Sequence, residues 1–126
     1  MKNYSLTLDT KKTIPHITVA EYGITFPSEA CKLLNFASYI HVFYDDDSKV
    51  VAFKPCEKDE DAYSFYKPNV GTPGNVRWTC RRPRNHIAKL LGVEPSKHGV
   101  KIYGFYSDED DMLIFEVSVK RDGGLK

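Results

Sequence analysis

The stretch ACKLLNF, residues 30–36, is matched 57 positions later by IAKLLGV, residues 87–93. In both stretches apolar residues recur at i, i+3 and i+4, the spacing of one face of an α-helix. The stretches also place Asn35 and Gly92 at equivalent positions, and these residue types best tolerate the left-handed conformation at a helix C-terminus. The spacing therefore predicts two short amphipathic helices, whose leucines lie in the core: Leu33, Leu34, Leu90 and Leu91.

The agreement continues on both sides of these helices. VFYDDDSKVVAF, residues 42–53, aligns without a gap with GFYSDEDDMLIF, residues 104–115. Upstream, residues 16–26 (HITVAEYGITF) and 75–83 (NVRWTCRRP) both alternate in the manner of β-strands. The sequence therefore predicts two copies of one unit, in which a strand and a short helix precede two strands joined by an acidic turn. Two unrelated helices, each followed by a hairpin, remain the alternative.

The length of 126 residues fits one domain. We predict repeat one at residues 14–55, a linker at 56–75, repeat two at 76–117 and a fraying tail at 118–126. Aromatic residues of the linker are expected to pack over the core or to add an edge strand: Tyr63, Phe65 and Tyr66.

The composition, 41% hydrophobic and 28% charged, is typical of a globular protein. The odd set of cysteines, Cys31, Cys56 and Cys80, has no spacing typical of a disulfide framework or a zinc site, which favours reduced thiols. No apolar run has the length of a signal peptide or a membrane span. We therefore expect a cytoplasmic protein that does not contact membranes.

Charge is distributed unevenly along the chain. Residues 77–101 carry seven lysines and arginines against the single acid Glu94, whereas residues 45–61 carry seven acids against three lysines. The acidic turns lack the glycine and the ligand spacing of a calcium loop, so we expect solvated hairpin turns and no metal.

Catalytic candidates are weak. Cys80 and His86 form the most suggestive pair, because neighbouring arginines could lower the pKa of a thiol. No third residue that would orient the pair is indicated, and the histidines show no metal-binding spacing. We therefore predict no enzymatic activity and no cofactor.

The run GITFPSE, residues 23–29, followed by a short helix and a hairpin ending in VVAFKP, resembles the AbrB/MazE/SpoVT family of swapped-hairpin transcription factors and antitoxins. The arginine that usually follows the glycine of this run is missing here. The resemblance covers residues 14–55 and is fainter over 76–117. The chain is also similar to uncharacterised bacterial and phage-type proteins of the same pattern.

The resemblance implies a β-rich α+β fold. In the family, two chains interleave into a closed barrel, which leaves no exposed strand edges. Two repeats in one chain could build a pseudo-two-fold swapped-hairpin barrel internally. The protein would then be a monomeric pseudo-dimer or a homodimer.

The family binds DNA through basic residues before the helix. The matching segment of the first copy, residues 16–29, has no lysine or arginine. The second copy supplies the candidate nucleic-acid-binding residues: Arg77, Arg81, Arg82, Arg84 and Lys89. The resemblance therefore implies a DNA-binding transcriptional regulator that contacts double-stranded DNA. The alternative is a protein-binding module, antitoxin-like or a phage-encoded inhibitor, that uses the same barrel to bind a protein partner.

Overall fold

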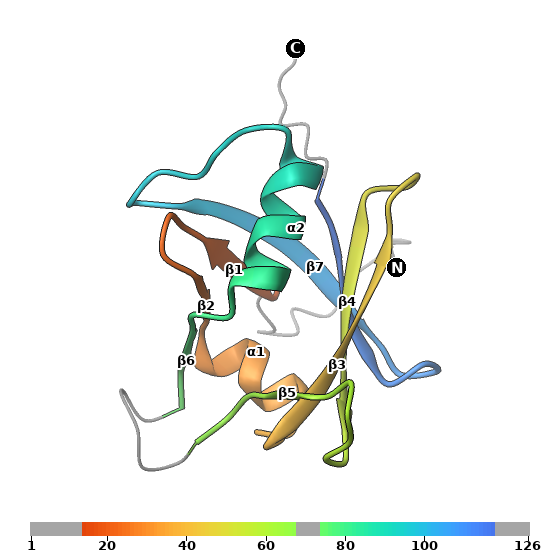
Figure 1. Cartoon of the computed structure of the whole chain (residues 1–126). Coiled ribbons are helices and arrows are strands. Elements are labelled where there is room, and N and C mark those ends of the chain that lie inside the picture. The colour runs from red at the N-terminus through yellow and green to blue at the C-terminus, as the bar shows by residue number, and fades with distance from the viewer. Residues whose placement is uncertain (1–13, 68–73, 118–126) are drawn as a thin grey trace, which may run out of the picture.

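Eight strands form one curled antiparallel sheet, accompanied by two helices, in the part of the chain that the structure describes (Figure 1). The structure is a computed structural model and describes residues 14–67 and 74–117. The elements are β1 (His16–Val19), β2 (Ile24–Phe26), α1 (Ser28–Leu33), β3 (Tyr39–Asp45), β4 (Val50–Cys56), β5 (Tyr63–Ser64), β6 (Val76–Trp78), α2 (Arg81–Leu91), β7 (Val100–Ser107) and β8 (Met112–Glu116). The predicted β-rich fold class is confirmed, while the predicted tail lies outside the described residues.

The order strand, helix, strand, strand occurs twice, as β2–α1–β3–β4 and as β6–α2–β7–β8. Both hairpins close in the same register, because Asp45 pairs with Val50 and Ser107 pairs with Met112. The residue before the second strand is left-handed in each turn, with φ of 58° at Lys49 and 55° at Asp111. The aspartate-rich turns are exposed, as predicted for solvated hairpin turns.

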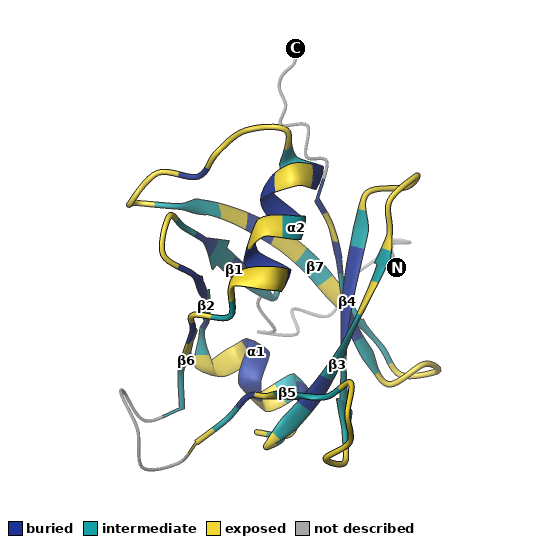
Figure 2. Ribbon diagram, in the orientation of Figure 1, coloured by how far each residue is buried: buried dark blue, intermediate teal, exposed yellow. Residues whose placement is uncertain are grey.

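The core lies on the concave side of the sheet, where α2 crosses in front of β7 (Figure 1). Aromatic rings fill its centre, with Phe26 making edge contacts to Phe53 and to Trp78. Figure 2 shows buried positions on α1 and α2 alternating with exposed ones, as an amphipathic helix requires. The leucine prediction is confirmed for two residues, since Leu34 and Leu90 are buried, whereas the other two are only partly buried and pack at the margin of the core: Leu33 and Leu91.

Both helices end as predicted. Gly92 is the C-cap of α2 with a φ of 79°. Asn35, just after α1, has a φ of 58°, and its backbone N–H donates to Lys32 O. The left-handed residues turn the chain away from each helix toward the following strand.

The expectation of a single strand over residues 16–26 is wrong. This segment is a hairpin of β1 and β2, in which Ala20 N–H donates to Gly23 O at 2.8 Å. A Cβ at Gly23 would lie 2.4 Å from the backbone oxygen of Trp78. The glycine is therefore required by the close approach of β6, a contact that is remote in sequence.

The second helix is longer than predicted and begins at Arg81. The sequence of residues 75–83 was expected to be strand-like, but the strand β6 ends at Trp78. Pro83 occupies the first turn of α2, where its missing N–H would have no intrahelical partner. The arginines at positions 81, 82 and 84 therefore lie on a helix, and only Arg77 lies on a strand.

The two ends of the sheet, β5 and β6, are brought close to each other. They pair with β3 and β2 respectively and not with one another. The indole N–H of Trp78 bridges them by donating to Ser64 O at 2.9 Å. The prediction for the aromatic residues of this segment is confirmed, because Phe65 is buried in the core and Tyr63 belongs to the edge strand β5.

Candidate nucleic-acid interface

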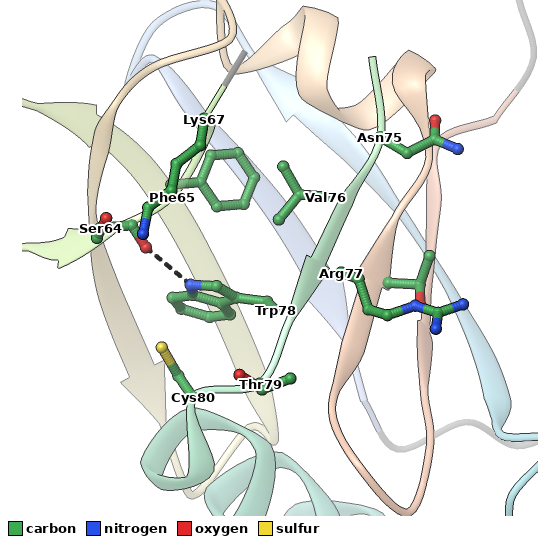
Figure 3. Close-up of a pocket in the computed structure, with 10 residues that line it drawn as sticks. Ser64, Phe65, Lys67, Asn75, Val76, Arg77, Trp78, Thr79 and Cys80 are labelled. Carbon is green, nitrogen blue, oxygen red and sulfur yellow. Dashed lines mark hydrogen bonds between the residues drawn. The ribbon is translucent and has the colours of Figure 1, made fainter. Parts of the chain in front are cut away.

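Arg77 lies on the outward face of β6. The strand has the burial pattern buried, exposed, buried, so Val76 and Trp78 face the core while Arg77 faces solvent. Its cross-strand partner on β2 is Thr25, which carries no charge. In Figure 3 the Arg77 side chain projects from the opposite side of β6 to Trp78. The guanidinium is therefore available to a ligand on the outer surface.

Three exposed residues of α2, Arg81, Asn85 and Lys89, are spaced four apart and form one stripe along the helix. Arg82 is exposed beside this stripe. The first turn contains no acidic residue, and the N-cap Cys80 makes no side-chain hydrogen bond to it. The free N–H groups of this turn and the arginines therefore add positive potential at the same place. We call the four exposed cations the basic surface: Arg77, Arg81, Arg82 and Lys89.

Arg84 is oriented differently from the other arginines. Its side chain is buried, with a residue exposure of 8%. Nε donates to Ala20 O at 3.0 Å, and the two terminal nitrogens bind Asn85 and Glu94. The guanidinium thus ties α2 to the β1–β2 turn and to the loop after the helix. Because these groups already engage it, we leave Arg84 out of the proposed DNA-binding residues.

The acidic turn between β3 and β4 reaches one side of α2. The His86 ring stacks on Tyr44 with ring centroids 3.8 Å apart, and its Nε2 lies 2.7 Å from Asp46 Oδ1. Burial, together with nearby Tyr63, raises the pKa of Tyr44 to about 12, against a smaller opposite effect of Arg82. Arg82 thus lies at the border of the basic surface with the acidic turn.

A cavity of about 520 Å³ opens between β5 and β6, beside Arg77 (Figure 3). We call it the seam. Its described lining includes Ser64, Phe65, Lys67, Val76, Arg77 and Trp78. Sequence reasoning missed both Lys67 and the seam, because neither follows from local pattern. Only the order of strands around the sheet brings β5 next to β6.

The thiol of Cys80 also lines the seam. Burial raises its pKa, although Lys67 acts in the opposite direction. This outcome differs from the lowered pKa that the flanking arginines suggested. A raised pKa reduces the thiolate fraction, so the environment does not activate this cysteine as a nucleophile.

No group of three or more potential metal-ligating side chains occurs within residues 14–67 and 74–117. Neither described helix is long and apolar enough to cross a membrane. Comparison of the chain with protein families, curated proteins and solved structures gave no match.

Proposed function

We propose that this chain is an AbrB-like DNA-binding protein and acts as a transcriptional regulator through the basic surface. The observation that carries the proposal is the position of four exposed cations on one strand and the helix that follows it. Phosphate binding needs such a cluster, because each neutralised phosphate releases condensed counterions and favours association. Arg77 and Arg81 additionally have the fork geometry that reads guanine edges.

The barrel part of the proposal is supported by the pairing of β4 with β8. Ala52 pairs with Ile114, its equivalent at the offset of 62 residues, and the neighbouring pairs exchange equivalent positions: Val51 with Phe115 and Phe53 with Leu113. β2 and β6, the strands that precede the two helices, also pair antiparallel across the two units, with Thr25 opposite Arg77. Both patterns are those expected for a two-fold axis that relates two copies of one unit. We infer an internally duplicated swapped-hairpin barrel of the AbrB type.

The two copies differ where DNA contacts are expected. The start of α1 carries Ser28 and Glu29, whereas the start of α2 carries Arg81 and Arg82. Glu29 is exposed and would repel a phosphate. One face of the pseudo-symmetric molecule is therefore assigned to DNA, and the chain binds a single half-site or self-associates to present two basic faces.

The test is binding of a labelled DNA duplex at two salt concentrations, about 50 and 200 mM. We expect the wild type to bind and the Arg81→Ala/Arg82→Ala variant to bind more weakly. The slope of log affinity against log salt should fall by about 0.9 for each phosphate contact that is lost.

The matched control is Lys32→Ala/Lys58→Ala, which removes the same charge from exposed positions outside the basic surface. This control should retain wild-type affinity. No wild-type binding at low salt, or equal losses in the two double variants, would contradict the proposal. Either result would favour the protein-binding module.

A further inference from the structure

The seam lies between two strands that are close in space but do not form a ladder with each other. β1 and β2 pair directly through a short turn, and they precede α1. β5 and β6 occupy the corresponding places before α2, yet they do not pair with each other. Among the described residues the outer edges of β5 and β6 have no strand partner, and both edges border the seam, so each can bond to an additional strand.

The width of the seam is set by an indole ring. The Trp78 side chain extends from β6 and its N–H reaches the backbone oxygen of Ser64 on β5 (Figure 3). A direct ladder hydrogen bond would bring the two backbones to about 4.8 Å, and a side chain of this length holds them further apart. The indole and the Phe65 ring also close the inner side of the seam, since both residues are buried.

The two sides of the seam differ in chemistry. The inner side is apolar, formed by Phe65, Val76 and Trp78. Two exposed cations also line the seam, Lys67 beside β5 and Arg77 on β6, with Lys67 running toward Ser64 and Arg77 projecting from the side of β6 opposite Trp78 (Figure 3). No carboxylate is found among the described residues that line the cavity. A strand that alternates apolar and acidic residues would place each type against its complement.

We propose that the seam binds an extended acidic segment of a partner protein by β-strand addition between β5 and β6. Backbone hydrogen bonds to the edges of β5 and β6 supply affinity, with the added strand replacing the Trp78 indole as the donor to Ser64 O. Apolar side chains contact Trp78 and Phe65, and acidic side chains pair with Lys67 and Arg77. This inference rests on the strand order and the cavity and is independent of the proposed DNA binding, although Arg77 belongs to both surfaces.

Trp78 is the only tryptophan of the chain, so its fluorescence reports on the seam directly. The probe is an acetylated and amidated peptide of Glu-Val repeats of about eight residues, the length of a typical strand. Two matched peptides serve as controls: a Lys-Val repeat, and the Glu-Val repeat with N-methyl groups on alternate backbone nitrogens. We expect the Glu-Val peptide to change Trp78 emission and to bind about tenfold more tightly than either control.

The Lys67→Glu/Arg77→Glu variant should reverse the preference between the Glu-Val and Lys-Val peptides. Its free-state emission and thermal unfolding should match those of the wild type, because both side chains are exposed. The proposal is overturned if no peptide changes Trp78 emission, or if the N-methylated peptide binds as well as its parent. It is also overturned if a DNA duplex displaces the peptide and changes Trp78 emission in the same way, since the seam would then belong to the nucleic-acid surface.

Discussion

The hydroxyl of Tyr44 is a buried polar group that has no hydrogen-bond partner among the described residues. The ring itself packs on His86 and borders the core. Burying a hydroxyl without a partner costs free energy, while the ring contributes packing. We therefore expect Tyr44→Phe to increase the free energy of unfolding by about 1 kcal/mol, measured by chemical denaturation.

Tyr106→Phe is the matched control for this prediction. The Tyr106 hydroxyl donates to Asp111, a bond that contributes most to raising its pKa to about 12. Removing this hydroxyl should lower stability slightly rather than raise it. If Tyr44→Phe destabilised the protein as much as Tyr106→Phe does, the Tyr44 hydroxyl would have a partner after all.

Cys31 illustrates how burial controls reactivity at a single residue. It is fully buried on α1, and burial raises the pKa of its thiol to about 11, against a smaller opposite effect of a hydrogen bond from the Val76 backbone. At about pH 8 only on the order of one thiol in a thousand would be ionised. We expect Cys31 to resist alkylation in the folded protein and to react only after denaturation, as followed by mass spectrometry. Rapid native-state modification of Cys31 would show that this helix opens readily.

At the scale of elements, the Arg84 side chain adds polar links between α2 and its neighbours to the apolar packing of the helix. Its three hydrogen-bonding partners belong to the β1–β2 turn, the helix itself and the following loop. Arg84→Ala would leave Ala20 O without this donor, so we expect a loss of about 1 to 3 kcal/mol in the free energy of unfolding. Thermal or chemical denaturation would measure it.

Arg81→Ala is the comparison on the same helix. Arg81 is exposed and forms no ion pair in the described residues, so its removal should change stability by less than about 0.5 kcal/mol. The two substitutions should therefore affect different properties: Arg84→Ala should lower the free energy of unfolding, and Arg81→Ala should lower the affinity for DNA. Equal stability losses would contradict the inward role assigned to Arg84.

The elements that could be predicted from the sequence are those fixed by local pattern. The apolar spacing around Leu34 and Leu90, and the helix ends at Asn35 and Gly92, depend only on near neighbours. The start of α2 was missed because alternation before Pro83 resembles a strand. The β1–β2 hairpin was missed because the reason for Gly23 is the approach of Trp78, which is remote in sequence.

The candidate site could be predicted only in part for the same reason. Sequence alone located the run of cations, and three of its arginines are indeed exposed. It could not indicate that Arg84 turns inward, because Ala20 lies 64 residues away from it. Lys67 was not considered, because its place in the lining of the same cavity as Arg77 depends on the order of strands around the whole sheet.

At the scale of the whole molecule, the two units have similar strand pairing but different surfaces. Ala52 on β4 pairs with Ile114, the equivalent residue on β8, so the last strands of the two units lie side by side in the sheet. Among the described residues, the basic surface and the seam both lie beside the second unit, next to β6 and α2. Both units contribute to the core, whereas the two proposed binding surfaces lie beside the second unit.

We propose that DNA binds the surface formed by β6 and the first turns of α2. The most direct measurement is the change in backbone amide NMR shifts of the isotope-labelled protein when a DNA duplex is added at low salt. We predict that the largest changes occur at Arg77, Arg81 and Arg82, and that they diminish in the Arg81→Ala/Arg82→Ala variant. Changes centred on α1 or on the outer faces of β3 and β7, or no changes at all, would show that DNA does not bind the basic surface.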